Sequence, residues 1–341
     1  MSSSSGTFSE KEVFYKEEIR KLKLELKDSY LENNDLRQRY HLALKIPQIE
    51  LSSSPILLNN KKTQEETIPF LFLSDWHWGE VVEPSEISFF NEFNVATARN
   101  RSELCFQKFV SFYKKEINLK YPGAVLLLGG DMVSGEIHEE LTESNEVHTM
   151  ESVIQCAEAI CDGLDLLLKS FGKVTVFCVV GNHGRSTKKV KFKKKTSSNF
   201  DWMVYAICNL HFSKSRNVEF FIPKTSECFF TVFNTSFLLV HGDTISSYTT
   251  DSITGAISAI ARGDEKLRKR QEAMGEPYDI LVCGHWHQYS LLPRRIINGS
   301  LKGYDEFGFY NSYLPEKPIQ ASWILDKKLG ITVSCPIYCD E

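Results

Sequence analysis

Long hydrophobic runs are missing from this 341-residue chain. No apolar stretch approaches the roughly 20 residues that cross a bilayer as a helix, so we expect no membrane contact. The N-terminus is polar and rich in serine, unlike the apolar segment of a secretory signal. No two of the nine cysteines have Cys-x-x-Cys spacing, and Cys178, Cys208 and Cys283 lie inside apolar runs. We therefore expect reduced packing cysteines in a cytoplasmic protein.

An excess of positive charge is also missing. The formal net charge of −4 excludes a protein that coats nucleic acid with a uniformly basic surface. A hydrophobic fraction of 42% and a charged fraction of 25% are ordinary for a globular protein. The length leaves material for one large domain with an appendage.

Glycine and proline are absent between Ser9 and Leu44, which predicts a long helix. Written in heptads, its core positions form two series: Ile19, Leu26, Asn33 and Tyr40, and Leu22, Ser29, Leu36 and Ala43. This seam favours either a coiled coil that makes a homodimer or binds a partner protein, or a single amphipathic helix. We predict an N-terminal helix over residues 1–46, a linker over 47–67 and the catalytic domain over 68–341.

The apolar run Ile68–Leu73 predicts a strand buried on both faces. It is followed by Ser74, Asp75 and His77. In an extended chain, residues two apart point to the same side, so Asp75 and His77 are expected to lie together. Such oxygen and nitrogen ligands suit Mn, Fe or Zn. Taken alone, this pair is equally typical of ordinary capping at a strand end.

Four further apolar segments also end in polar residues. They cover residues 124–128, 174–180, 236–240 and 278–283, and they end in Asp131, Asn182-His183, His241-Gly-Asp243 and His285-x-His287. Helices are expected over 96–120, 146–170, 199–212 and 252–274 between them. Alternating strands and helices predict an α/β fold with its ligands beyond the carboxyl ends of the strands. Five of the nine histidines fall at these ends, and turn formation has no use for them.

In this order of motifs, the chain resembles the calcineurin-like metallophosphoesterase superfamily over residues 68–287. The resemblance implies a four-layer α/β/β/α sandwich that binds two divalent metal ions, most simply Mn, with Fe or Zn as alternatives. It implies that Asp75, His77 and His287 hold the first ion, that Asn182, His241 and His285 hold the second, and that Asp131 bridges both. It further implies a phosphodiesterase with a metal-bound hydroxide and with His183 as general acid.

Two positions depart from the family pattern. Gly184 follows His183 where the family usually has an acidic residue, so any acid that orients His183 must come from elsewhere, such as Asp243 or Glu136. Ser134 stands where many members carry a second aspartate. Arg185 is expected to contact the substrate phosphate as a planar, permanently charged donor.

A basic segment follows His183. Its cations are Arg185, Lys188, Lys189, Lys191, Lys193, Lys194 and Lys195, with Phe192 among them. Beside a phosphodiester site this segment favours a clamp for nucleic acid, and the alternative is a solvated loop without a ligand. We therefore expect a DNA exo- or endonuclease.

The end of the chain carries a weaker resemblance. Segments 319–325 and 330–337 predict an edge hairpin, and the tail at Asn298-Gly-Ser resembles phage-type and SbcD-like DNA repair exonucleases. The alternatives are a small-nucleotide phosphodiesterase or phosphatase, a protein phosphatase, and a scaffold protein on the same fold. For Trp76 we expect a place in the core or in the wall of the site, whereas for Trp78 core, wall and base stacking stay open.

Overall fold

The computed structural model describes residues 66–245 and 253–340, together with Leu57, Leu58 and five helical residues between Glu18 and Lys27. The chain divides into two units, residues 1–49 and 50–341. The heptad positions from Ile19 to Ala43 lie outside the described residues, so the coiled coil stays a prediction. In the described part of the chain, no helix combines the length and the apolar character needed to cross a membrane.

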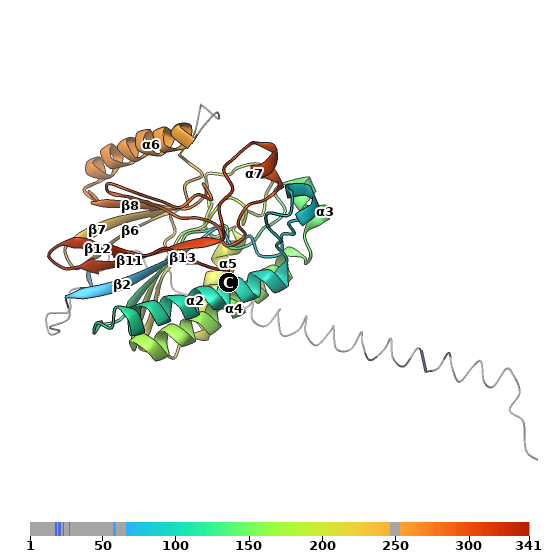
Figure 1. Ribbon diagram of the computed structural model, residues 1–341, viewed down its shortest axis with the longest axis horizontal. Helices are drawn as coiled ribbons and strands as arrows, with labels where there is room; N and C mark the ends of the chain where they lie inside the picture. The colour runs from blue at the N-terminus through green and yellow to red at the C-terminus, as the bar shows by residue number, and fades with distance from the viewer. Residues whose placement is uncertain are drawn as a thin grey trace, which may run out of the picture. The chain divides into compact units, whose positions relative to one another are not determined.

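Two β-sheets form the centre of the second unit (Figure 1). In order across the first sheet lie β12 (Gly330–Ser334), β11 (Ile319–Asp326), β2 (Thr67–Leu73), β3 (Ala124–Leu128), β4 (Val174–Cys178) and β5 (Val218–Phe221), with β13 (Ile337–Tyr338) paired to β11. The second sheet has the order β1 (Leu57–Leu58), β6 (Glu227–Val232), β7 (Thr235–Val240), β8 (Ile280–Cys283), β10 (Arg295–Ile297) and β9 (Ser290–Leu292). Strands β2 to β5 are parallel, as are β7 and β8, so their carboxyl ends meet at one edge.

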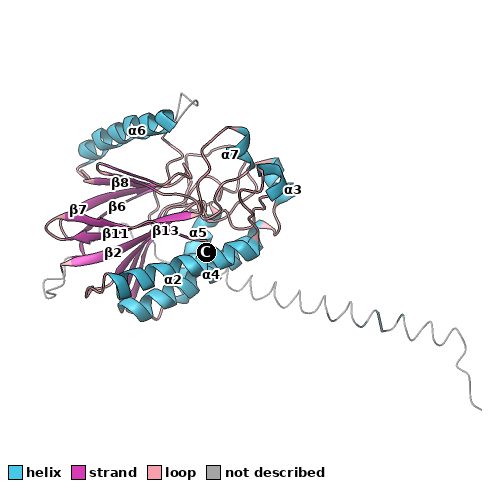
Figure 2. Ribbon diagram, in the orientation of Figure 1, coloured by secondary structure: helices cyan, strands magenta, loops and turns pink. Residues whose placement is uncertain are grey.

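Helices cover the outer faces of both sheets (Figure 2). The first sheet is covered by α2 (Val95–Ser111), α4 (Thr149–Phe171) and α5 (Phe200–His211), and the second by α6 (Ile253–Met274). Two short helices, α3 (Glu139–Ser144) and α7 (Glu306–Tyr310), lie among the loops at one end of the sheets. A 3-10 turn at Pro84–Ile87 lies in the loop after β2.

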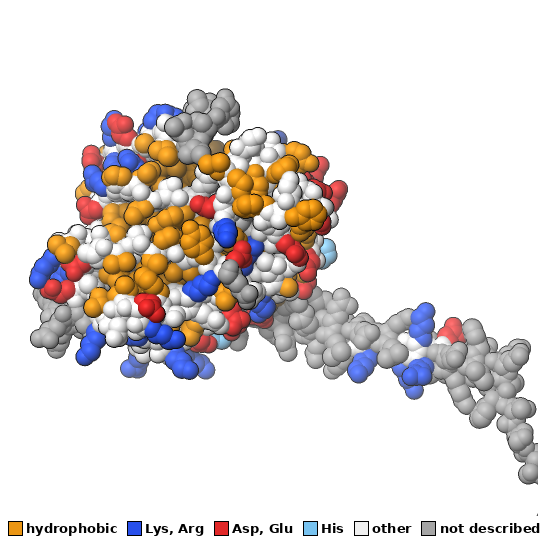
Figure 3. Space-filling model, viewed as in Figure 1, with side chains coloured by type: hydrophobic (Ala, Val, Ile, Leu, Met, Phe, Trp, Pro, Cys, Tyr) orange, Lys and Arg blue, Asp and Glu red, His pale blue; other side chains and the backbone are white. Residues whose placement is uncertain are grey.

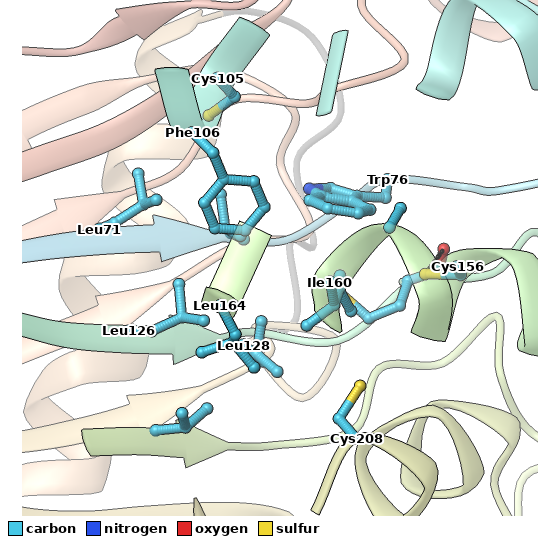
Figure 4. Packing of buried hydrophobic residues seen from close by; sticks show 14 of the residues in the cluster. Leu71, Trp76, Cys105, Phe106, Leu126, Leu128, Cys156, Ile160, Leu164 and Cys208 are labelled. Atoms are coloured by element: carbon cyan, nitrogen blue, oxygen red, sulfur yellow. Dashed lines mark hydrogen bonds between the residues drawn. The ribbon is translucent and has the colours of Figure 1, made fainter. Parts of the chain in front are cut away.

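Three hydrophobic clusters fill the spaces between these four layers. Strand β3 shows the origin of two of them, because alternate residues of a strand face opposite sides. Leu126 and Leu128 belong to the cluster under α2, α4 and α5, whereas Val125 and Leu127 belong to the cluster between the two sheets. Figure 4 shows the first cluster, where Leu71, Leu126 and Leu128 lie near helix residues such as Phe106, Ile160 and Leu164. A third cluster joins the second sheet to α6. The predicted four-layer α/β/β/α fold is therefore confirmed.

The predicted elements are found with shifted ends. The helix predicted over 96–120 leaves the α conformation after Ser111 and continues as a π-helical turn over Phe112–Glu116. The C-terminal hairpin is confirmed as β11 and β12. Sequence reasoning missed β6, β9 and β10, and the interval expected to be a linker contains β1, which pairs with β6.

Candidate metal centre

The loops that follow β2 and β3 lie side by side at the edge of the first sheet. The Asp75 N–H donates to the Gly130 carbonyl at 3.0 Å, and the His77 N–H donates to the Asp131 carbonyl at 3.0 Å. Asp75 and His77 have φ values of 56° and 48°. The extended geometry that we predicted for this pair is therefore wrong, because both residues adopt left-handed backbone. Their side chains nevertheless reach the same cluster.

Glycine is needed where these loops approach one another. A Cβ atom at Gly181 would lie 2.1 Å from Asp131 Oδ1, and one at Gly284 would lie 2.4 Å from Asp75 Oδ2. Real Cβ atoms do not come this close to an oxygen, so any other residue would push the loops apart. The glycines beside the predicted ligands thus allow loops of the two sheets to meet.

Asp75, His77 and His287 form the first cluster, although Asp75 and His287 are 212 residues apart. Their ligand atoms all lie within 4.8 Å of one another. The Nε2 atoms of His77 and His287 are 3.1 Å apart, and His287 Nε2 lies 3.3 Å from Asp75 Oδ1. Asp75 and His77 are buried, whereas the side chain of His287 is 27% exposed and marks the open side.

Asp131, His241 and His285 form the second cluster, again with ligand atoms within 4.8 Å. His241 Nε2 lies 2.9 Å from Asp131 Oδ2 and 3.1 Å from Asn182 Oδ1. Asp131 also forms a group with His77 and His183, which connects the two clusters. The structure therefore brings all seven predicted ligands to one place, with Asp131 between the two sets.

The donor atoms of both clusters fit divalent cations. Imidazole nitrogens and carboxylate oxygens suit Mn, Fe or Zn. Two imidazole nitrogens 3.1 Å apart are held either by a hydrogen bond, with one of them as the N–H donor, or by a cation between them, because two facing lone pairs repel. Burial alone would lower the pKa of His241, but the Asp131 carboxylate outweighs it and raises that pKa to about 10. The negative charge of Asp131 that favours a proton on His241 would also favour a metal cation between the two side chains.

Residues 68–289 match the family model of the calcineurin-like phosphoesterases. The chain belongs to this family. Membership makes the protein a metal-dependent phosphoesterase, a hydrolase, and the two clusters supply ligands for divalent ions. A comparison with curated proteins finds no match.

A carbonyl or a carboxylate lies near the outer ring nitrogen of two clustered histidines in this phosphoesterase. His241 Nδ1 lies 2.8 Å from the Gly129 carbonyl, which leaves Nε2 for the cluster. His77 Nδ1 lies 3.1 Å from Glu80 Oε2, close enough for an ion pair although not aligned for a hydrogen bond. Sequence reasoning missed Glu80, and its position directly after the Asp-x-His-x-Gly run was the available signal.

Asp201 is a second residue that sequence reasoning missed. Its carboxylate is fully buried and accepts the N–H groups of Asp131, Met132 and Gly181. It thereby joins the loop after β3 to the loop after β4. The sequence carries no signal for this role, because Asp201 lies in the first turn of α5, where acidic residues are ordinary.

His183 lies against the clusters with its ring anchored by a backbone atom. Its N–H donates to Asp131 Oδ1 at 2.7 Å, and its Nδ1 lies 3.0 Å from the Ser134 carbonyl. Burial lowers the pKa of His183 to about 3. The carboxylates expected to orient this ring lie elsewhere, since Asp243 pairs with Lys195 and Glu136 accepts a hydrogen bond from Thr149. The Ser134 carbonyl takes the place of an acid.

Arg185 does not point its donors into the clusters. Its guanidinium donates to the carbonyls of Asn182, Thr187 and Lys188, so it holds the turn after His183 in shape. Three of its five N–H donors are used in this way, and the expected contact with the substrate phosphate stays a prediction.

The lysines after Arg185 fall into two groups. Lys188 pairs with Glu139 at 2.6 Å and Lys195 pairs with Asp243 at 2.7 Å, so the segment is tied at both ends. Between these ties, Lys189, Lys191, Lys193 and Lys194 are exposed and form no ion pair with any described residue. Phe192 among them is 92% exposed.

Trp76 and Trp78 are both fully buried in the cluster under the helices. Their Nε1 atoms donate to Gln320 and Gln155 respectively. The expectation for Trp76 is confirmed, and Trp78 is a core residue too. Base stacking by Trp78 is excluded, because no part of its ring reaches the surface.

Proposed function

We propose that this phosphoesterase cleaves phosphodiester bonds of DNA as an exo- or endonuclease that uses Mn²⁺. The basic segment between the two ion-paired lysines, Lys188 and Lys195, carries the proposal. The segment begins just after His183, and at its other end Lys195 forms an ion pair with Asp243, which lies in the same loop as His241. The segment therefore runs from one part of the metal centre to another.

Four cations without an ion-pair partner among the described residues, on so short a segment, favour a polyanionic substrate. Such exposed lysines can contact several consecutive phosphates. The exposed ring of Phe192 supports the same reading, because bases of a single strand stack on aromatic side chains. The view in Figure 3 has Lys and Arg interspersed with Asp and Glu around the rim of the face. Because the formal net charge is −4, the basic segment is a local feature and not part of a general positive coat.

The proposed chemistry assigns Asp75, His77 and His287 to one ion, Asn182, His241 and His285 to the other, and Asp131 to both. Bound there, the two ions would neutralise the phosphate and hold the attacking and leaving oxygens in line. His183 would deliver a proton from Nε2 to the leaving oxygen, because Nδ1 is occupied by the Ser134 carbonyl. Because Nδ1 faces a carbonyl, it carries the proton of the neutral ring, and Nε2 carries none. Since burial favours the neutral ring, Nε2 would first take up a proton from solvent, which the bound phosphate anion would favour, and would then pass it to the leaving oxygen.

The test uses the purified full-length protein with Mn²⁺. Single- and double-stranded DNA are compared with bis-p-nitrophenyl phosphate, small cyclic nucleotides and a phosphopeptide. We expect DNA degradation that stops when the metal is chelated. Turnover of the small diesters or of the phosphopeptide without DNA degradation would contradict the nuclease proposal.

A further inference from the structure

A buried carboxylate behind the metal centre has no part in the chemistry described so far. Glu80 is 7% exposed and lies between His77 and Lys302. Its Oε2 atom lies 3.1 Å from His77 Nδ1, and its Oε1 atom lies 2.6 Å from Lys302 Nζ. A carboxylate enclosed in this way would destabilise the fold unless its charge were compensated.

Lys302 compensates that charge and is itself held from several sides. Its ammonium group is 2.5 Å from Asp305 Oδ2, and the whole residue is only 3% exposed. Its carbonyl accepts hydrogen bonds from Asn91 Nδ2 at 2.9 Å and from Arg101 Nη1 at 2.6 Å. The ammonium group therefore has a fixed position, and so does the carboxylate that it contacts.

The charges of this group do not cancel. Glu80 and Asp305 contribute two negative charges and Lys302 contributes one positive charge, so one negative charge remains behind His77. On the opposite side of the ring, His77 Nε2 faces His287 Nε2 at 3.1 Å. A proton on Nδ1, facing Glu80, leaves Nε2 free to bind a metal ion. Glu80 would act on this proton through its charge at 3.1 Å, and a carboxylate in this position raises the basicity of a metal-binding imidazole.

Ser134 connects the same carboxylate to the histidine proposed as acid. Its Oγ atom lies 3.4 Å from Glu80 Oε2, and its carbonyl lies 3.0 Å from His183 Nδ1. The residue is completely buried. One rigid group therefore faces the Nδ1 atoms of both His77 and His183.

We propose that Glu80, fixed by Lys302, is a positioning residue that sets the tautomer and orientation of His77 for metal binding. The inference rests on the metal-binding part of the proposed function and is independent of the substrate. Its experiment therefore measures the metal directly, and it gives an answer whether or not the protein cleaves DNA.

The main test is titration of the metal-free protein with Mn²⁺ by calorimetry. Glu80→Gln keeps the volume of the side chain and removes its charge, so we expect Mn²⁺ binding to weaken by about 10- to 100-fold. Glu83→Gln is the matched control, because Glu83 lies on the same loop but is exposed. Lys302→Met should weaken Mn²⁺ binding as well. The double variant Glu80→Gln/Lys302→Met should bind Mn²⁺ as weakly as Glu80→Gln alone, because Lys302 acts through Glu80.

Three results would overturn the proposal. The first is Mn²⁺ binding by Glu80→Gln within twofold of the wild type. The second is a Lys302→Met effect that adds in full to that of Glu80→Gln. The third needs no variant and holds even if the substitutions impair folding. In the wild-type protein loaded with Zn²⁺, nitrogen NMR of ¹⁵N-histidine should show His77 protonated at Nδ1, and protonation at Nε2 contradicts the proposed tautomer.

Discussion

The carboxylate of Asp201 accepts the backbone N–H of Asp131 at 2.9 Å and that of Gly181 at 2.8 Å, both through Oδ2. Its other oxygen accepts the N–H of Met132 at 3.0 Å. A single buried side chain thus fixes the spacing between Asp131 and the loop that carries Asn182. The geometry of the second cluster depends on a residue that touches no metal.

We expect Asp201→Ala to destabilise the protein strongly. The substitution leaves three buried N–H groups without an acceptor, and each costs about 1–3 kcal/mol, so the free energy of unfolding should fall by about 3 kcal/mol or more. Urea denaturation of the metal-free protein measures the change. Asp162→Ala, at an exposed position of α4, is the control and should change it by less than about 0.5 kcal/mol. A loss below about 1 kcal/mol for Asp201→Ala would show that the N–H groups find other partners.

His183→Ala should lower kcat by about 10²- to 10⁴-fold, the usual loss for a general acid. The Mn²⁺ content should stay at the wild-type value, because His183 is not among the proposed ligands. Metal analysis together with steady-state kinetics separates the two quantities. His211→Ala, at the exposed end of α5, serves as control. Full activity of His183→Ala would refute the acid role, and loss of bound metal would make His183 a ligand.

Neutralising the unpaired lysines should weaken DNA binding in a salt-dependent way. A variant with Lys189, Lys191, Lys193 and Lys194 changed to glutamine loses up to four phosphate contacts. We expect a higher KM for DNA. The slope of log affinity against log salt concentration should be less negative by about 3. The matched control changes four exposed lysines elsewhere: Lys115, Lys120, Lys214 and Lys224. An unchanged salt slope in the first variant argues against the clamp.

Glu316 makes the stability of the fold depend on pH. Burial raises the pKa of this carboxyl to about 7, although it accepts the N–H of Tyr289. The folded state therefore binds the carboxyl proton more tightly than the unfolded state does, and this contributes to the free energy of unfolding. The contribution is complete below the pKa of the unfolded state and is lost as the pH rises through about 7. Between about pH 5 and pH 8, the free energy of unfolding of the wild type should fall by about 1–2 kcal/mol more than that of Glu316→Gln, after allowance for solvent screening.

Urea denaturation of both proteins at several pH values, without metal, measures this difference. Glu272→Gln, at an exposed position of α6, is the control and should follow the wild type. Parallel pH profiles for the wild type and Glu316→Gln would show that the carboxyl titrates at its ordinary pKa.

The parts of the site that sequence reasoning found are those encoded locally. Each ligand follows a buried strand such as Ala124–Leu128, and the strand pattern alone brings those ends to one edge. The resemblance to the family then assigned each ligand to one of two metal ions. In this way His287 and Asp75 were assigned to the same ion, although 212 residues separate them.

The parts that sequence reasoning missed depend on tertiary contacts between ordinary residues. Lys302 reaches Glu80 from 222 positions away, and although Glu80 directly follows the Asp-x-His-x-Gly run, nothing in the sequence pairs the two residues. The bonds of Arg185 to its own turn were hidden in the same way, because their acceptors are backbone carbonyls, whose positions the residue types do not give. The left-handed backbone of Asp75 and His77 was equally hidden, because it arises from pairing with the neighbouring loop.

Three of the five tryptophans in the chain are direct neighbours of proposed ligands. Trp76 and Trp78 flank His77 with ring centroids 6.2 Å apart, and Trp286 follows His285. Indole emission is sensitive to charges and paramagnetic ions at such short range. Intrinsic fluorescence should therefore decrease as Mn²⁺ fills the centre, so occupancy of the site can be followed optically in the unlabelled protein.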